Sequence, residues 1–356
     1  MSRFISPRLS GVTPYTPGEQ PKDCKYIKLN TNESPYPPSE AVRAAVREES
    51  GTLRLYSDPE CSRFAASLAQ LYGLRPGQII AGNGSDEILE FAFMAFADES
   101  RPLAFPDITY GFYPVLAGIN HIPYTEVPLK EDYTVEPADY AGLGSRVIVI
   151  ANPNAPTGLC LPLTEIEKLL KAVPDSLVIV DEAYVDFGGE SAVRLVERYD
   201  NLLVTQTFSK SRSMAGARLG FAVGNEALIR DMNTIKYSIN PYNVNRMTEA
   251  AGCAALADNA YYMENCRRIM ETREKTVAGL KALGFQVLPS KANFILAASA
   301  RIDGGELYQA LKARGILVRH FEKPRISRFV RITIGTPEQM EALTAAVAQI
   351  LKEREK

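Results

Sequence analysis

Short, continuously apolar runs alternate with amphipathic stretches along most of the chain. Between residues 39 and 275 these runs are rich in Val and Ile, and they lie in QIIAGNGS, RPLAF, RVIVIANP, LVIVDEAY, NLLVTQTFSK and RLGFAVG. Strands without a polar face are typical of a sheet that helices cover on both sides. We therefore predict a large α/β domain over residues 39–275.

The two ends of the chain differ from this central region. Residues 276–356 supply fewer strands, in GFQVLPSKANFILAAS, GILVR and FVRITIG, and a final helix is expected from about Pro337 to Lys352. This pattern predicts a smaller α+β domain. Seven of the 23 prolines lie within the first 40 residues, and their turn chemistry argues against a packed N-terminal domain. We interpret residues 1–38 as an arm.

One strand of the smaller domain separates an arginine from its aliphatic residues. In residues 328–334 the period of two puts Val330 and Ile332 on one face and Arg331 on the other. The spacing alone leaves two interpretations open, a solvated arginine on a half-exposed strand and a contact to a ligand.

Composition and charge exclude several classes of protein. Of the 356 residues, 46% are hydrophobic and 23% are charged, as in ordinary globular proteins and unlike disordered or collagen-like chains. The formal charge of -2 gives no global reason to bind nucleic acid or anionic lipid. The longest nearly apolar stretches, 91–97 and 250–257, are far shorter than the roughly 20 residues that cross a bilayer. Because the opening residues also lack the apolar core of a secretory signal, we expect a cytoplasmic protein.

Cysteine and histidine are too sparse for several kinds of site. An odd number of scattered cysteines without a CxxC pair fits reduced thiols; they are Cys24, Cys61, Cys160, Cys253 and Cys266. With only His121 and His320 available, we expect neither a His/Cys zinc site nor a histidine-based triad.

The first candidate motif is the glycine-rich turn GNGSDE at residues 82–87, between an apolar strand and an amphipathic run. Unpaired N–H groups and the dipole at such a helix start favour an anion, which makes the turn a candidate phosphate cup. The dinucleotide fingerprint needs glycine where Glu87 stands, and the P-loop needs a Gly-Lys pair that the chain lacks. The alternative is an ordinary capped helix with Ser85 as N-cap. If a phosphate docks, the carboxylates of Asp86 and Glu87 must point away.

The second motif, LVIVDEAY, delivers Asp181 at the carboxyl end of a buried strand, where open α/β sheets bind ligands. A magnesium-binding strand of an ATPase would look similar, but it depends on nucleotide phosphates and a phosphate loop. Pairing with a buried cation and a plain structural role both remain open for this carboxylate.

The third motif, TQTFSKSRSMAGARLG, gathers Thr207, Ser209, Lys210 and Arg218 in a turn after an apolar strand. Such a cluster can hold a phosphate beside a reactive amine. A polar surface loop is the alternative, because Ser, Lys and Arg are common in loops.

Together the three motifs supply what a phosphorylated pyridine aldehyde needs. The chain resembles the fold-type I pyridoxal-phosphate enzymes, most closely the histidinol-phosphate aminotransferases. The resemblance covers nearly the whole chain, in PGEQP (17–21), LNTNESPYPPS (29–39), GNGSDE, ITYGFY (108–113), NPNAPTG (152–158), VDEAY, TFSKSRSMAGARLG, NFIL and VRITIGT. It implies pyridoxal 5'-phosphate as cofactor and a large domain with a mainly parallel seven-stranded sheet.

The resemblance also implies roles for individual residues. Lys210 would bond covalently to the cofactor and then move a proton during the reaction. Asp181 would pair with the pyridinium nitrogen, Tyr184 would bond the phenolic oxygen, and Tyr110 would stack on the ring. The phosphate would be held by backbone amides and side chains of Gly84, Ser85, Asp86, Thr207, Ser209 and Arg218.

One position departs from the family pattern. The family usually carries Asn directly before Pro-Thr-Gly to bond the phenolic oxygen, but this chain has Ala155. Asn154 would take over this contact only if the Ala155-Pro156 peptide bond is cis or otherwise bent. A plain turn role for Asn154 is an equal alternative.

The substrate side is also implied by the resemblance. Arg331 would clamp the carboxylate of glutamate in one half-reaction and the phosphate of the other substrate in the second, with Arg319 as a second candidate for that phosphate. Tyr56 matches a tyrosine that reaches the neighbouring subunit's site, which implies a homodimer with the arm packed on the small domain or on the partner. An aromatic residue before a turn is the alternative for Tyr56.

We predict a transaminase that moves an amino group between L-histidinol phosphate and 2-oxoglutarate, giving imidazole-acetol phosphate and glutamate in histidine biosynthesis. Aromatic amino-acid aminotransferases and threonine-phosphate decarboxylases, which use the same scaffold, are enzymatic alternatives. A non-catalytic regulatory module would need a DNA-binding domain for which the motifs, beginning near residue 17, leave no room. A nucleotide-driven ATPase is disfavoured by the missing Gly-Lys pair.

Overall fold

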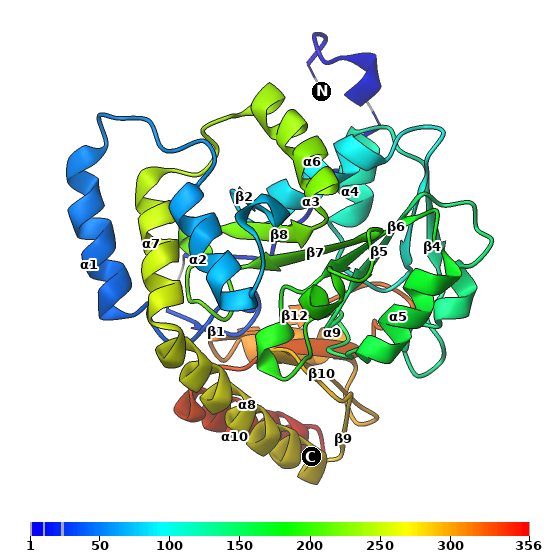
Figure 1. Cartoon of the computed structure of the whole chain (residues 1–356). Helices are drawn as coiled ribbons and strands as arrows, with labels where there is room; N and C mark the ends of the chain where they lie inside the picture. Colours follow the sequence, from blue (N-terminus) through cyan, green and yellow to red (C-terminus); the bar gives the residue numbers. More distant parts are fainter. Residues whose placement is uncertain (1, 10, 23–24, 356) are drawn as a thin grey trace.

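The computed structural model describes residues 2–9, 11–22 and 25–355. Its largest sheet has the order β2-β8-β7-β6-β5-β3-β4; β8 is antiparallel to both neighbours, and the other adjacent pairs are parallel. The strands are β2 (Ile79–Gly82), β3 (Leu103–Pro106), β4 (Tyr124–Val127), β5 (Val147–Ala151), β6 (Leu177–Asp181), β7 (Leu202–Thr207) and β8 (Gly220–Gly224). The predicted seven-stranded, mainly parallel sheet is therefore confirmed (Figure 1).

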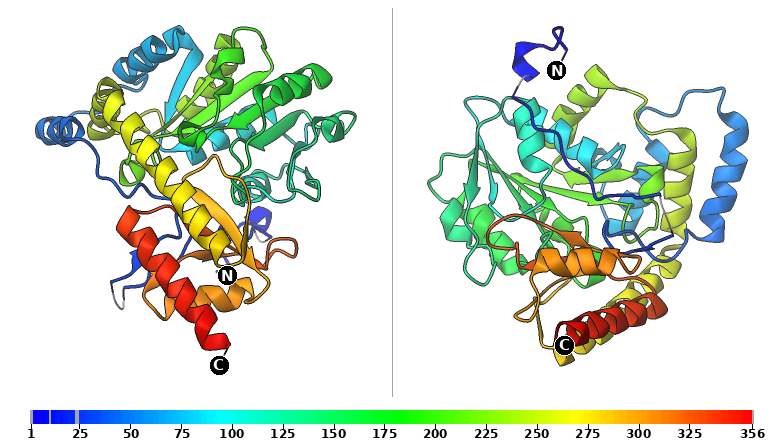
Figure 2. Two further views of the ribbon diagram at one scale, coloured as in Figure 1. Left: turned by 90° about the horizontal axis from the view of Figure 1, so that it is seen from below. Right: turned by 180° about the vertical axis from the view of Figure 1, so that it is seen from behind.

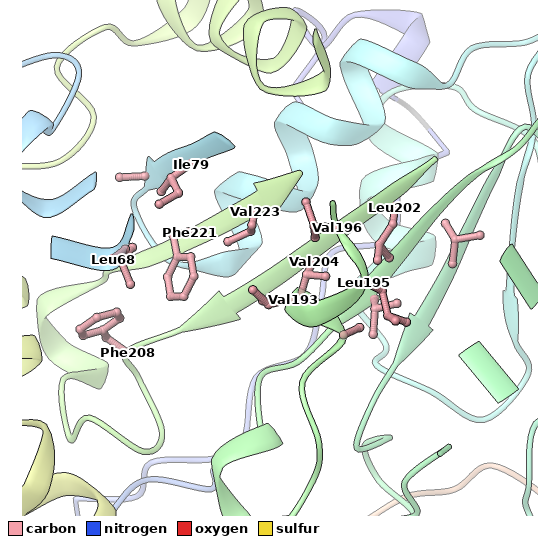
Figure 3. Close-up of a cluster of buried hydrophobic side chains, with 14 of the residues drawn as sticks. Leu68, Ile79, Val193, Leu195, Val196, Leu202, Val204, Phe208, Phe221 and Val223 are labelled. Atoms are coloured by element: carbon pink, nitrogen blue, oxygen red, sulfur yellow. The ribbon is translucent and has the colours of Figure 1, made fainter. Parts of the chain in front are cut away.

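Helices cover both faces of this sheet, which explains why its strands have no polar face. Successive strand residues point to opposite sides, so Ile148 belongs to one apolar layer and Val149 to the other. The first layer includes residues of α2 (Ser62–Tyr72), α5 (Leu163–Ala172) and α7 (Arg246–Ala257), and α7 also contacts α1 (Glu40–Glu49). The second includes α3 (Ser85–Phe96), α4 (Tyr113–Ile119) and α6 (Glu226–Ile239). Figure 3 shows part of the first layer, with Phe208 and Phe221 packed beside Leu68.

A second, antiparallel sheet is built from the C-terminal residues, in the order β12-β13-β10-β9. Its strands are β9 (Phe285–Val287), β10 (Phe294–Ser299), β12 (Arg319–His320) and β13 (Phe329–Thr333), and its helices are α8 (Asn259–Ala282), α9 (Gly304–Lys312) and α10 (Pro337–Arg354). These elements gather at one end of the molecule (Figure 2). The smaller α+β unit was expected. The domain limits stay a prediction, because α8 runs continuously through residue 275.

The N-terminal segment begins at the opposite end of the molecule and crosses the large domain to reach this C-terminal unit, as the dark blue trace in the right view of Figure 2 shows. Strand β1 (Ile27–Lys28) pairs in parallel with β11 (Ile316–Leu317). Farther upstream, Glu19 forms an ion pair of 2.5 Å with Lys312 on α9. The segment therefore contributes to the structure around the second sheet.

The described residues also bear on the predictions about membrane spans and cysteines. No helix in these ranges is long and apolar enough to span a membrane. Cys61, Cys160, Cys253 and Cys266 are free thiols, in agreement with the sequence prediction. The same prediction for Cys24 lies outside the described residues.

Candidate active site

Functional side chains meet at one edge of the large sheet. Asp181 ends β6, Thr207 ends β7, and α3 starts three residues after β2. Because the carboxyl ends of parallel strands share an edge, these three predicted motifs come together around a cavity of about 440 Å³. The predicted residues that line it are Ser85, Asp86, Tyr110, Asp181, Tyr184, Thr207, Ser209, Lys210, Arg218, Arg319 and Arg331.

Asp181 is a buried carboxyl group without a basic partner among the described residues. Its Oδ2 accepts a hydrogen bond of 2.7 Å from the Tyr113 hydroxyl, and its Oδ1 accepts one of 3.3 Å from Thr205. Burial raises the pKa of Asp181 to about 6, although the Tyr113 hydrogen bond opposes this effect. A buried carboxyl at a cavity wall is suited to pair with a cation on a bound ligand.

The turn before α3 and the side chain of Arg218 form an anion cradle. Gly84 has φ +90°, and a Cβ at this position would lie 2.5 Å from Arg218 Nη2. Arg218 Nη1 lies 3.5 Å from Ser209 Oγ, which in turn accepts a 3.0 Å hydrogen bond from Thr207. Gly84 does not line the cavity itself, but its missing side chain lets the guanidinium approach the start of the helix.

The expectation that Ser85 caps α3 is wrong. The N-cap is Gly84, and Ser85 is the first residue of the helix and lines the cavity. The physical reason is the left-handed backbone at Gly84, which turns the chain sharply one residue earlier than a serine cap would.

The two acids that follow Ser85 point in different directions. Glu87 turns away, since its Oε2 accepts hydrogen bonds of 2.6 Å from the Asn83 backbone and the Asn243 side chain. Asp86 faces the cavity, where it accepts a 3.0 Å hydrogen bond from Tyr110 and lies 3.1 Å from Arg218 Nη2. The sequence analysis required both carboxylates to point away from a docked phosphate, and only Glu87 does so in this structure.

Lys210 and Tyr184 lie beside one another and against the N-terminal segment. Lys210 Nζ donates a 3.1 Å hydrogen bond to the backbone oxygen of Thr31, and it lies 5.7 Å from the centre of the Tyr184 ring. The Tyr184 hydroxyl accepts a 3.0 Å hydrogen bond from Asn32 Nδ2. An amine and a phenol thus share one wall of the cavity.

The loop at residues 152–158 presents Ala155, and not Asn154, to the cavity. The Ala155-Pro156 peptide is cis. The Asn154 amide nevertheless donates to the Ile108 backbone oxygen and to Thr157, and its oxygen accepts from Thr109. Those contacts hold the side chain within the loop, so it has the turn role that the sequence left open.

Arg319 and Arg331 are direct cross-strand neighbours on β12 and β13, which puts both guanidinium groups on one face. The Arg331 guanidinium lies between the rings of Phe294 and Phe321, 5.3 and 5.4 Å from their centres. Its Nη2 donates to the Asn30 backbone oxygen at 2.9 Å, and its buried Nε has no partner in the described ranges. Two adjacent cations with unused N–H groups are suited to an anion. Arg331 therefore lines the cavity, which favours the ligand-contact interpretation over the solvated one.

Tyr56 lies outside the cavity of its own chain. Its side chain is 77% exposed, and its ring stacks on Tyr242 with centres 4.5 Å apart. The role in a neighbouring subunit therefore stays a prediction.

Sequence reasoning missed the part of the cavity that the N-terminal segment provides. Tyr15, Asn30, Thr31 and Asn32 all line the cavity, and Tyr113 holds Asp181 from α4. The available signal was LNTNESPYPPS, in which polar residues concentrate without any helix or strand pattern. That motif was used only for the family resemblance.

These features fit pyridoxal phosphate. The carboxyl of Asp181, which has no basic partner among the described residues, suits a pyridinium, and the Gly84 cradle with Arg218 suits a phosphate. Lys210 lines the same cavity as both. Together with the mainly parallel sheet, this site defines the fold-type I class of pyridoxal-phosphate-dependent enzymes.

Comparison with known proteins identifies the family. The family described as Aminotransferase class I and II matches residues 25–347. Histidinol-phosphate aminotransferase 2 of Dechloromonas aromatica is 51% identical over 98% of this chain and 99% of its own length, and the Marinomonas sp. histidinol-phosphate aminotransferase is 51% identical with the same coverage. The chain belongs to the class I and II aminotransferase family, which confirms the predicted enzyme class.

A solved structure supports the fold independently. The histidinol-phosphate aminotransferase of Sinorhizobium meliloti in complex with pyridoxal-5'-phosphate superposes with a TM-score of 0.90 over 99% of both chains, at 23% identity. At this level of identity the likeness concerns the fold alone, and it confirms the predicted fold class.

Proposed function

We propose that this protein is a pyridoxal-phosphate-dependent transaminase acting on L-histidinol phosphate and 2-oxoglutarate, with imidazole-acetol phosphate and glutamate as products, in histidine biosynthesis. The observation that carries the proposal is that Lys210 and Asp181 line the same cavity as the cross-strand pair Arg319 and Arg331. The choice of substrate is supported by full-length relatives at about 50% identity that bear this name.

The cofactor and the protein divide the chemistry between them. When bound, pyridoxal 5'-phosphate supplies a carbonyl carbon that joins amines and a ring that accepts electrons from the substrate α-carbon. Lys210 provides the amine, and its Nζ then carries the proton that leaves the substrate α-carbon. Asp181 keeps the ring nitrogen protonated, because a buried anion beside it favours the charged form.

The remaining cavity residues orient the two ends of the cofactor. Tyr184 holds the phenolic oxygen, and Tyr110 covers the ring. The phosphate is bound at the start of α3 by backbone N–H groups of Gly84, Ser85 and Asp86 and by Thr207, Ser209 and Arg218. A phosphate bound there would replace Asp86 as the partner of Arg218, and the Asp86 carboxylate would have to turn aside.

Arg331 and Arg319 bind the anionic group of each substrate. A planar guanidinium can donate two parallel hydrogen bonds to a carboxylate or to a phosphate, so one clamp serves both half-reactions. The unpartnered Nε of Arg331 and its remaining N–H groups are available for this contact.

The active unit in this proposal is a homodimer in which Tyr56 reaches the partner's cavity. The side chain of Tyr56 is 77% exposed beside Tyr242, so most of its surface is accessible to a partner subunit. The division into an arm (1–38), a large domain (39–275) and a small domain (276–356) belongs to the same proposal. The cytoplasmic location expected from the sequence stays a prediction.

Absorption spectroscopy and chemical trapping test the proposal. Purified protein should show a visible band that histidinol phosphate converts to that of the aminated cofactor, and borohydride reduction should place the pyridoxyl label on Lys210. Lys210→Ala is the control and should give neither result. A steady-state preference for phenylalanine or threonine phosphate would contradict histidinol phosphate as the substrate. A pyridoxyl label on another residue would contradict Lys210 as the residue that binds the cofactor.

A further inference from the structure

Asn32 occupies an unusual place at the wall of the cavity. Its side chain is 1% exposed, and its backbone adopts φ +58°, a left-handed conformation that asparagine tolerates better than most residues. It lies 152 positions from Tyr184 in the chain, and yet its Nδ2 is 3.0 Å from the Tyr184 hydroxyl. None of the chemistry described above has used this contact.

The orientation of the Asn32 amide is fixed by Thr333 at the end of β13. The Asn32 backbone N–H donates to Thr333 Oγ1 at 3.0 Å, and the Thr333 hydroxyl donates to Asn32 Oδ1 at 2.9 Å. With Oδ1 accepting from Thr333, the NH₂ group faces Tyr184. The Asn32 backbone oxygen also accepts a 2.9 Å hydrogen bond from Asn293, so both ends of the residue are held.

The adjacent backbone is held just as closely. Thr333 N–H donates to Leu29 O at 3.0 Å, Arg331 donates to Asn30 O, and Lys210 donates to Thr31 O. The backbone oxygen of every residue from 29 to 32 therefore accepts a hydrogen bond from the second sheet or from the cavity wall. This fastening limits the freedom of Asn32 to turn its amide away from Tyr184.

We propose that Asn32 is a positioning residue that directs the hydroxyl hydrogen of Tyr184 into the cavity. Because Asn32 Nδ2 can only donate, the Tyr184 oxygen must accept this bond and its own hydrogen is left to donate elsewhere. The acceptor it then meets is the phenolic oxygen of the cofactor, so the inference rests on the proposed function. The order Thr333, Asn32, Tyr184 forms a chain of hydrogen bonds with one direction of donation.

The surrounding residues leave this task to Asn32. Ala155, which packs in the same small cluster as Tyr184, has no polar side chain, and the Asn154 amide is held by its own loop. The Tyr184 ring is fixed edge-on against Phe294, with centres 5.0 Å apart. Packing thus sets where the hydroxyl oxygen lies, and Asn32 sets where its hydrogen points.

The test is a spectroscopic pH titration of the holoenzyme. A hydrogen bond donated to the phenolic oxygen stabilises its negative charge and lowers the pH at which the visible band changes. Asn32→Asp keeps the shape but can only accept, so it draws the Tyr184 hydrogen away. Asn32→Gly removes the donor without adding charge and keeps the left-handed backbone. Both variants are expected to raise the apparent pKa of the band by about 0.5 to 1 pH unit.

A second background separates positioning from a general loss of structure. In Tyr184→Phe, Asn32→Gly should not move the titration by more than about 0.2 pH unit, since the hydroxyl is already gone. Thr333→Ser, which keeps the hydroxyl that holds Asn32, should titrate like the wild type. The neighbouring ionisable groups Lys210, Arg331, Tyr15, Tyr110 and Tyr113 are unchanged in the Asn32 variants. Asn32→Asp adds a carboxylate of its own, so the comparison with and without the Tyr184 hydroxyl is made with Asn32→Gly.

Two results would overturn the inference. One is an unchanged titration in both Asn32 variants, and the other is an equal shift with and without the Tyr184 hydroxyl. A wild-type protein that shows no cofactor band would overturn the proposed function together with this inference. A normal band with an unchanged titration in the variants would overturn this inference alone.

Discussion

The hydrogen bond between Tyr113 and Asp181 makes the stability of the apoprotein depend on pH in a defined way. Both side chains are buried, and the bond is 2.7 Å long. Burial raises the pKa of Asp181 from 3.8 to about 6. The folded state therefore binds a proton more tightly than the unfolded state, and this group's contribution to stability falls as pH rises from about 4 to 6. Tyr113→Phe removes a donor that favours the charged carboxylate, so the pKa of Asp181 should rise further.

The size of the effect follows from the charge on the acceptor. A hydrogen bond to an ionised group contributes about 1.5 to 3 kcal/mol, whereas one between neutral groups contributes about 0.5 to 1.5 kcal/mol. At pH 5 the carboxyl is mostly protonated, and at pH 8 it is ionised. Tyr113→Phe should therefore cost about 1 to 2 kcal/mol more unfolding free energy at pH 8 than at pH 5.

Urea denaturation of the apoprotein, followed by far-ultraviolet circular dichroism, measures this difference. Tyr262→Phe is the matched control, because Tyr262 is equally buried but its hydroxyl bonds the neutral backbone N–H of Ser39. The control should cost the same at both pH values. An equal cost for Tyr113→Phe at pH 5 and pH 8 would refute the assignment of a charged acceptor.

Three further substitutions test other parts of the site. Gly84→Ala should weaken binding of pyridoxal phosphate about tenfold or more in a fluorescence titration, because the added Cβ meets Arg218 and the backbone φ is +90°. The control Gly216→Ala, where a Cβ meets nothing within 4 Å, should bind the cofactor normally. Arg331→Lys should raise KM for glutamate and histidinol phosphate roughly 10- to 100-fold and change kcat less, since lysine cannot form two parallel hydrogen bonds; unchanged KM values would contradict the clamp. Burial raises the pKa of Glu182 to about 7, so the contribution of this group to stability falls as pH rises from about 4.5 to 7. Glu182→Gln should therefore flatten the pH dependence of the urea midpoint by the equivalent of about 1 to 3 kcal/mol. A variant whose midpoint changes with pH in parallel with the wild type would contradict this prediction.

Within the large sheet, the strands that the sequence predicted correctly are those buried on both faces. β5 and β6 are fully buried and read as continuous Val and Ile runs. The strand β4 (Tyr124–Val127) was not predicted, because it is an edge strand with three exposed residues between two prolines. β1 was missed for a different reason, since its two residues become a strand only through pairing with Ile316 and Leu317.

At the site, the sequence identified the residues that follow strands. Asp181 and Lys210 follow apolar runs, and the common edge of parallel strands is enough to predict that they meet. Arg218 lies in the same turn as Lys210, just before the antiparallel strand β8. Serine is a common N-cap, which favoured Ser85, but the positive φ of Gly84 places the cap one residue earlier, where Arg218, more than 130 residues away, approaches the turn. Whether Asn154 faces the cavity depended on its partners Ile108 and Thr109, which no local pattern reveals.

Local chemistry therefore determined the elements and the types of group available to the reaction. Hydrophobic period and turn residues act over a few positions, and they were sufficient for the six buried strands of the large sheet, the glycine turn and the position of Lys210 after its strand. Only the tertiary structure decided which way those groups point. The direction of the Tyr184 hydroxyl depends on Asn32, and Asn32 depends on Thr333, 301 residues farther along. A hydrogen bond needs its donor and acceptor atoms within about 3 Å of each other. The separation of two residues in the sequence does not show whether their atoms come that close in the folded protein.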